Sequence, residues 1–122
     1  MISFSNLTKK RVNTKIFKGL GSKIFNEEFE LSVVFAPPSL MLALNKRYLN
    51  KNKPANVLSF LLERWRGEIF LNTGLPRRGK AGEKKLPYLF VHGALHLLGF
   101  NHRGSNDTKK MDNRALKILN LK

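Results

Sequence analysis

All three histidines of this chain lie within residues 92–102, in the stretch HGALHLLGFNH. His92 and His96 are four residues apart in an apolar segment that predicts a helix, so both imidazoles would leave one face of it. Gly99 can end that helix with a positive φ, and the chain could then turn back and deliver His102. Three neutral imidazoles suit zinc and keep a fourth position for water, which is typical of a catalytic site. The alternative is three core histidines with satisfied hydrogen bonds, but their number and spacing favour a metal site.

The residue that follows the first histidine limits the reactions that this motif can catalyse. The spacing H-x3-H-x2-G-x2-H is also that of the metzincin proteases, HExxHxxGxxH, in which the glutamate takes a proton from the zinc-bound water. In this chain that position is Gly93. The motif therefore predicts a hydrolytic metal site but argues against peptide hydrolysis, and a metalloprotease is the least favoured function.

The charge balance predicts a polyanionic partner. Lys and Arg total 23 against 8 Asp and Glu, which gives a formal net charge of +15. So large an excess favours nucleic acid, with an acidic membrane surface as the lesser option and a simple solvated lysine-rich surface as the alternative. The chain has no cysteine, which excludes disulfides and thiolate metal sites. The longest apolar run, residues 86–100, is shorter than the roughly 20 residues of a membrane span, so we expect a soluble, cytoplasmic protein.

Four segments predict strands, because they alternate apolar and polar residues or are rich in β-branched and aromatic ones. They are residues 1–7, 29–37, 57–62 and 67–72. Helical patterns lie between and after them, so the chain predicts one α/β or α+β domain of about four strands.

The helices that we expect begin with a basic one, capped by Thr8 and running to about Phe25. Its buried stripe would consist of Val12, Ile16, Leu20 and Ile24. Ser39 would cap a second helix over residues 40–49, with Leu40, Leu44 and Tyr48 in line.

The last third of the chain predicts a mobile basic loop and two more helices. Residues 73–85, TGLPRRGKAGEKK, have the glycines and the proline of a loop. Residues 86–100 would form the central apolar helix, with Pro87 in its first turn. Residues 106–122 would form an amphipathic helix with Met111, Leu116 (or Ala115) and Leu119 facing inward.

Three blocks of this sequence resemble the YbeY family, single-domain endoribonucleases of bacterial ribosomal RNA maturation. VHGALHLLGFNH is similar to the family signature H-G-x-L-H-L-x-G-[FY]-x-H. LNKRYLNKNKPANVLSF, residues 44–60, is similar to L-N-x-x-Y-R-x-K-x-K-P-T-[DN]-V-L-S-F, and RGEIFLN, residues 66–72, to L-G-[DE]-I-x-[IL]. The blocks occur in the family's order, and Leu49 stands where the family has an arginine that is thought to contact substrate.

The resemblance implies a fold, a cofactor and partners. The fold would be a single α+β domain over residues 1–122, with a mixed four-stranded sheet and a metzincin-like zinc helix. His92, His96 and His102 would hold one Zn²⁺ per chain. The activity would be cleavage of single-stranded RNA, on small-subunit ribosomal RNA late in ribosome assembly, with ribosomal proteins as further partners. Leu49 and the missing glutamate keep a second function open, an RNA-binding assembly factor with a structural metal and little hydrolytic activity.

Other residues are candidates for contact with the RNA or the metal site. Glu68 could orient a histidine or act as an acid–base group, or it could pair with a basic side chain. Arg47, Lys51 and Lys53 would lie in a loop at the rim of the cleft and hold phosphate, unless that loop is only solvated. A phosphate-tracking role is also open to basic residues of the loop 73–85, namely Arg77, Arg78, Lys80, Lys84 and Lys85. Trp65 and Tyr88 could stack on bases, although core packing is favoured for both.

Overall fold

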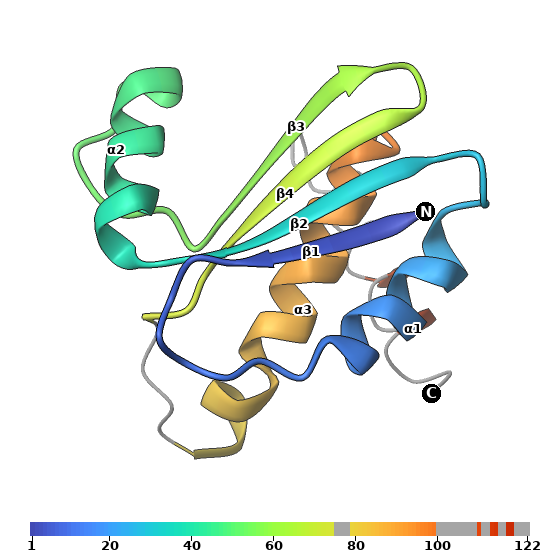
Figure 1. Cartoon of the computed structure of the whole chain (residues 1–122), viewed down its shortest axis with the longest axis horizontal. Coiled ribbons are helices and arrows are strands. Elements are labelled where there is room, and N and C mark those ends of the chain that lie inside the picture. Colours follow the sequence, from blue (N-terminus) through green and yellow to red (C-terminus); the bar gives the residue numbers. More distant parts are fainter. Residues whose placement is uncertain (75–78, 100–109, 111–112, 115–116, 119–122) are drawn as a thin grey trace.

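The computed structural model describes residues 1–74 and 79–99, together with residues 110, 113–114 and 117–118 of the C-terminal segment. Seven elements follow one another along the described chain, and Figure 1 shows their arrangement. They are β1 (Ile2–Asn6), α1 (Thr14–Ile24), β2 (Glu30–Ala36), α2 (Pro38–Leu49), β3 (Val57–Glu63), β4 (Arg66–Asn72) and α3 (Gly79–Leu97).

The four strands form one mixed sheet in the order β1-β2-β4-β3. β1 pairs with β2 and β2 with β4 in parallel, whereas β3 and β4 are antiparallel and joined by a tight hairpin. All four predicted strands are present, and the predicted α+β fold with a mixed four-stranded sheet is confirmed.

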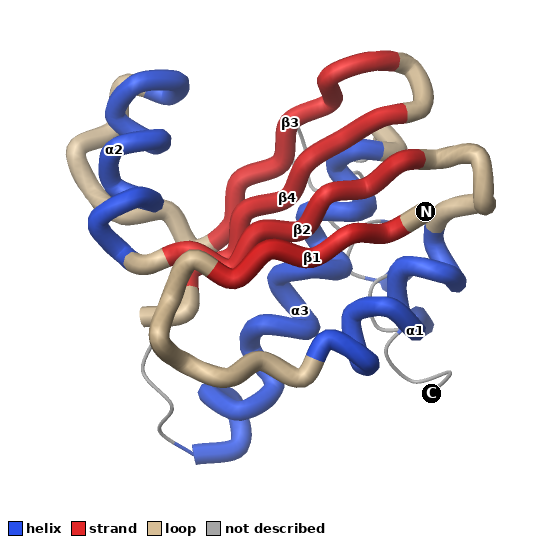
Figure 2. The backbone as a smooth tube through the Cα atoms, in the orientation of Figure 1, coloured by secondary structure: helices blue, strands red, loops and turns tan. Residues whose placement is uncertain are grey.

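The two faces of the sheet are covered differently, as Figure 2 shows for the backbone. α1 and α3 pack on one face, and the main core lies between them and the inward residues of the strands. There the ring of Phe17 from α1 meets Phe35 of β2 and Phe90 of α3 edge-on, at centroid distances of 5.2 and 5.6 Å. The opposite face carries a smaller cluster in which Met41 of α2 packs against Ala36 and Leu58. The histidine helix therefore belongs to the main core and α2 to the other face.

α1 begins later than the sequence pattern predicts. Its cap is Asn13, whose side chain accepts a hydrogen bond from the backbone N–H of Lys15 at 3.1 Å. The predicted cap, Thr8, is wrong, because its backbone N–H and its hydroxyl both donate to Oδ1 of Asn6, at 2.9 and 2.6 Å. The Thr8 oxygen accepts from the N–H of Lys10 at 3.2 Å, so Thr8 belongs to a local turn that ends before the helix begins.

The predicted buried stripe of α1 is also partly wrong. Leu20 is buried as expected, but Ile16 is 42% exposed and its neighbour Phe17 is buried instead. Gly21 completes the buried face, because an added Cβ there would meet the side chain of Ile2. The aromatic ring of Phe17, rather than the Ile16 side chain, fills the space between β2 and α3.

α2 begins at Pro38 after Pro37, not at a Ser39 cap, and Pro37 makes no side-chain capping bond. Its buried residues are Met41 and Asn45, whereas Tyr48 is 57% exposed. The helix ends at Asn50, which adopts the left-handed conformation at φ 55°.

α3 is longer than predicted. It begins at Gly79, inside the segment expected to be a loop, so Pro87 lies within the helix rather than in its first turn. Of the predicted C-terminal helix, residues 110, 113–114 and 117–118 are helical, and Ile118 is buried in the main core. Met111, Ala115, Leu116 and Leu119 lie outside the described residues. Across the described part of the chain, none of the helices combines the length and the apolar character that crossing a bilayer requires.

Candidate functional site

His92 and His96 lie one turn apart on the outer side of α3, as the sequence predicted. The neighbouring positions Phe90, Ala94 and Leu97 are buried in the main core. His92 is half-buried and His96 is exposed. The helix therefore presents both imidazoles on the same side, away from the residues that pack against the sheet.

Gly93 brings this turn of α3 into close contact with the sheet. A Cβ added at Gly93 would lie 2.9 Å from Oγ of Ser59, 3.1 Å from Cγ2 of Val57 and 3.3 Å from Cγ2 of Ile69. The Ser59 hydroxyl also donates a hydrogen bond to the carbonyl of Gly93, at 3.0 Å. A glutamate here would point into the sheet between β3 and β4, away from His92. Packing against the sheet therefore favours glycine at the position of the protease glutamate, and the same glycine removes the general base of the protease.

Nε2 of His92 is buried, although the residue as a whole is only half-buried. The ring of Tyr88, one turn earlier on α3, contacts the imidazole at a centroid distance of 4.3 Å and an angle of 47°. Neutral imidazole nitrogens are common donors for zinc, and the donor set predicted from the sequence fits that metal.

Gly99 ends the helix as expected. Its φ is 101°, and its backbone N–H donates to the carbonyl of His96 at 3.0 Å. His102, the predicted third ligand, lies outside the described residues, so the three-histidine site and its metzincin-like geometry stay predictions. Within residues 1–74 and 79–99 and the described C-terminal positions, no group of three metal-ligating side chains is found.

Glu68 lies on the other face of the sheet. Its neighbours Gly67 and Ile69 face α3, because an added Cβ at Gly67 would meet Leu97 and Ile69 packs at Gly93. Since side chains alternate along a strand, Glu68 points to the opposite face, where it pairs with Phe60 of β3. The structure does not bring Glu68 to the histidines, and the expected role in orienting one of them does not fit this placement.

The predicted basic rim lies at the start of β3. Arg47 is not in the loop, as expected from the sequence, but in the last turn of α2. Lys51 and Lys53 do lie in the loop, and they line a pocket of about 380 Å³. The other lining residues are Asn45, Leu49, Pro54, Ala55, Asn56, Val57 and Leu58. Two of the three predicted contacts therefore share one pocket.

Two buried asparagines hold this loop in place, and sequence reasoning missed both. Nδ2 of Asn45 donates to the carbonyl of Lys53 at 2.8 Å, and Nδ2 of Asn72 donates to the carbonyl of Ala55 at 3.1 Å. Oδ1 of Asn72 accepts from the N–H of Gly74 at 2.9 Å. Asparagine in a strand or in an apolar helix is a signal that could have identified them, because a buried amide needs partners.

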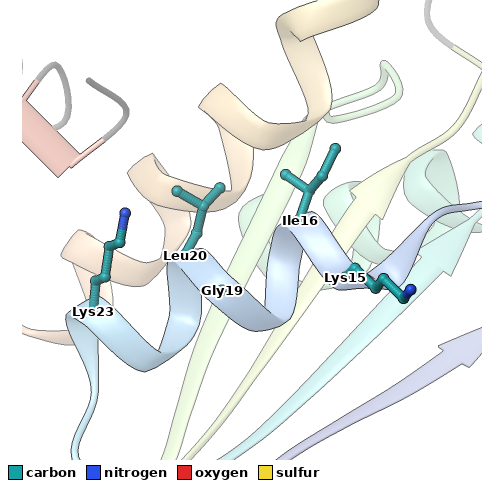
Figure 3. A pocket seen from close by; sticks show the side chains of 5 residues that line it. All are labelled: Lys15, Ile16, Gly19, Leu20 and Lys23. Carbon is teal, nitrogen blue, oxygen red and sulfur yellow. The ribbon is translucent and has the colours of Figure 1, made fainter. Parts of the chain in front are cut away.

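A second pocket, of about 220 Å³, lies along α1 (Figure 3). Ile16 and Leu20 point the same way from the helix, while Lys15 points away from them. Gly19 and Lys23 complete the lining. None of the predicted site residues belongs to this pocket.

The two aromatic residues for which core packing was favoured are both on the surface. Trp65 is 46% exposed at the tip of the β3–β4 hairpin, and Tyr88 is 37% exposed on the histidine side of α3. Of the predicted phosphate-tracking residues, Arg77 and Arg78 lie outside the described residues. Lys80, Lys84 and Lys85 fall within α3 rather than in a loop.

The chain is similar over nearly its whole length to proteins of one family. A family model described as Endoribonuclease YbeY matches residues 2–121. A protein of that name from Staphylococcus saprophyticus is 34% identical over 137 aligned residues, which cover 95% of this chain and 90% of that protein. Another from Mycoplasma mycoides is 30% identical, with 99% of this chain and 91% of that protein covered.

The fold is similar to that of a solved structure. The solution structure of a Thermotoga maritima protein matches with a TM-score of 0.63 and 24% sequence identity. The match covers 97% of this chain and 86% of that one. At this identity the likeness establishes the shared fold.

Proposed function

The chain belongs to the endoribonuclease YbeY family, and on that premise we propose that it is a zinc-dependent endoribonuclease that cleaves single-stranded RNA. Its proposed role is the maturation of small-subunit ribosomal RNA late in ribosome assembly, in the cytoplasm and in contact with ribosomal proteins. The family makes the chain a nuclease with RNA as its partner. The metal and the ribosomal substrate belong to the proposal.

The observation that carries the proposal is the turn of α3 that holds His92 and His96. Its inner side is fixed on the sheet by Gly93 and by the Ser59 hydrogen bond, and its outer side presents two imidazoles. His92, His96 and His102 would hold one Zn²⁺. When bound, this ion would supply an activated water and a Lewis acid for the phosphoryl group.

The residues of the chain would bind and orient the RNA strand around this turn. The loop with Lys51 and Lys53 enters β3 at Val57, two residues and about 7 Å along the strand before Ser59. Val57 lies against Gly93 on the inner side of the histidine turn, so the basic loop ends next to the helix that carries His92 and His96. Lysine supplies a point charge for a phosphate, and Asn45 and Asn72 fix the backbone that carries it.

Metal analysis and RNA cleavage test the proposal together. The purified protein should contain about one zinc per chain, by the three-imidazole donor set. A His92→Ala, His96→Ala double variant should lose both the zinc and the cleavage of a single-stranded RNA. The matched control is Lys18→Ala, Ser22→Ala, an exposed pair with the same spacing on α1, which should retain both.

The second function predicted from the sequence gives a different result in the same experiment. If the protein is an RNA-binding assembly factor with a structural metal, wild type binds zinc and RNA but does not cleave above background. The histidine variants would then lose folding or ribosome association. Wild-type protein that binds no zinc, with cleavage that is unchanged in the double variant, would contradict the proposed metal mechanism.

A further inference from the structure

The tip of the β3–β4 hairpin exposes apolar and aromatic surface that the proposed function has not used. Trp65, the one tryptophan of the chain, is 46% exposed there, and Leu61, which precedes it on β3, is 55% exposed. Leu62 between them is also exposed. Leu61 and Leu62 are adjacent on β3 and point to opposite faces, so the apolar feature that the turn itself presents is the exposed Trp65 ring.

The tip also carries positive charge against the aromatic ring. The guanidinium carbon of Arg64 lies 5.3 Å from the centroid of the Trp65 ring, as in a cation–π pair. Arg66 follows and is more than half exposed, with Glu63 as a weak partner at 3.9 Å. Arginine stacked on a ring keeps its N–H groups available for a phosphate.

The backbone of the tip is anchored, so its side chains are presented from a fixed position. The N–H of Glu30 donates to the carbonyl of Trp65 at 2.8 Å, which ties the turn to β2. The register between β3 and β4 shifts between Leu61 and Glu63, which marks a bulge next to the turn. Bulges are common where a strand redirects side chains beside a functional site.

The tip lies at the same end of the sheet as the carboxyl end of α3. An added Cβ at Gly67 would come within 2.9 Å of the Leu97 side chain, and Leu97 directly follows His96. Trp65 lies in the turn, two residues before Gly67. In Figure 1 the end of α3 lies behind the hairpin, in agreement with this contact. Leu61 pairs with Gly67 and so shares the face that α3 covers.

We propose that the hairpin tip is a base-stacking subsite for single-stranded RNA, with Trp65 as the stacking ring and Arg64 as a phosphate contact. This inference rests on the proposed function, because it places the subsite beside the histidine turn. A strand that enters along Lys51 and Lys53 would pass the histidines and stack a base on Trp65 beyond them. The subsite recognises unpaired bases, since a base inside a duplex has no free face to stack.

RNA is the occupant that the charges favour over a protein. The chain has a formal net charge of +15, and two arginines flank the exposed ring at the tip. Aromatic rings beside basic side chains are the usual means of binding single strands without sequence preference.

Intrinsic fluorescence tests the contact directly, because Trp65 is the only tryptophan. The wild-type protein is titrated with a short single-stranded RNA, whose integrity is checked on a gel, and with an abasic strand of equal length. The RNA should quench the tryptophan emission, and the abasic strand should not at equal occupancy, since it carries phosphates without bases. RNA binding without quenching would overturn the proposal.

Variants separate stacking from charge and from folding. Trp65→Ala should weaken RNA binding roughly 5- to 150-fold, as loss of one stacked base does, while Trp65→Phe keeps a ring and most of the affinity. A plot of log affinity against log salt concentration has a negative slope, and Arg64→Ala should make that slope less steep by about 0.7. Arg64→Lys should restore the wild-type slope. Thermal unfolding of each variant reports whether it folds.

Ile16→Ala is the matched control. Ile16 is 42% exposed, close to the exposure of Trp65, but it lies on α1 and belongs to no predicted site. Its loss should change RNA affinity less than about twofold, as for an ordinary surface substitution. An equal loss in Ile16→Ala and Trp65→Ala, or unchanged affinity in Trp65→Ala, would contradict the proposal, and the latter would point to a protein partner.

The two proposals fail separately. Quenching by RNA in a wild-type protein that cleaves nothing supports the stacking subsite and contradicts the nuclease mechanism. Zinc-dependent cleavage without quenching supports the mechanism and contradicts the subsite.

Discussion

Replacing Gly93 by alanine tests how the histidine helix is held on the sheet. Alanine is a better helix former than glycine by about 1 kcal/mol, so the substitution should stabilise the helix if nothing opposes it. At Gly93 the new methyl group would meet Ser59 at 2.9 Å, Val57 at 3.1 Å and Ile69 at 3.3 Å. Such overpacking costs about 1–3 kcal/mol. We therefore expect the free energy of unfolding of Gly93→Ala to fall by about 0–2 kcal/mol.

Gly19 provides the matched control. It also lies inside a helix, α1, but an added Cβ there would have no atom within 4 Å. Gly19→Ala should therefore raise the free energy of unfolding by about 0.5–1 kcal/mol. The difference between the two variants, about 1–3 kcal/mol, is the contribution of the contact with the sheet and is independent of helix propensity.

Urea unfolding, followed by circular dichroism, measures both variants against wild type. Adding Ser59→Ala to Gly93→Ala removes the nearest atom, so the double variant should lose less stability than the two single losses combined, by at least about 0.5 kcal/mol. If Gly93→Ala is stabilised as much as Gly19→Ala, the helix does not lie against β3 and β4 at this point, and the reasoning is refuted.

Three further predictions follow from other contacts. Gly93→Glu introduces the glutamate of the protease motif. It should destabilise the fold by several kcal/mol and give no peptide cleavage, because the carboxylate would be buried against Val57 and Ile69. A variant as stable as wild type in an unfolding assay would contradict this prediction. Asn72→Ala should lower stability by about 1–3 kcal/mol, since it leaves the Ala55 carbonyl and the Gly74 N–H without their partner, as thermal or urea unfolding can measure. Asn50→Ala should cost about 1 kcal/mol at φ 55°, whereas Asn50→Gly should be nearly neutral, and equal stability of the two would argue against the left-handed cap.

The strands could be predicted from the sequence because each is short, apolar or alternating, and bounded by turn residues. The helix boundaries were harder, because they depend on competition for hydrogen bonds. Thr8 has the residue type of a helix cap, but it is bonded to the Asn6 side chain in a turn, and the helix begins after Asn13 instead. Likewise the choice between Ile16 and Phe17 depends on a space between β2 and α3 that local sequence does not describe.

The candidate site could be predicted where a single helix defines it. The spacing of His92 and His96 fixes their common side in any helix, and the glycine at position 99 ends that helix as expected. The position of Glu68 could not be predicted, because strand alternation gives two faces but does not say which of them α3 covers. The roles of Asn45 and Asn72 could not be predicted either. Both donate to carbonyl groups of the loop before β3, and Asn72 lies 17 residues after its partner Ala55.

The strand order also affects the stage of folding at which the histidine turn packs against the sheet. β2 and β4 pair in parallel, residue 30 with residue 66, and β3 is added outside β4. The hydrogen bond that holds α3 on the sheet joins Ser59 and Gly93, which are 34 residues apart. Contacts over such separations form late and slow the folding of a domain. His92 and His96 are near neighbours in sequence, yet the environment that would make them a site forms only as the whole sheet does.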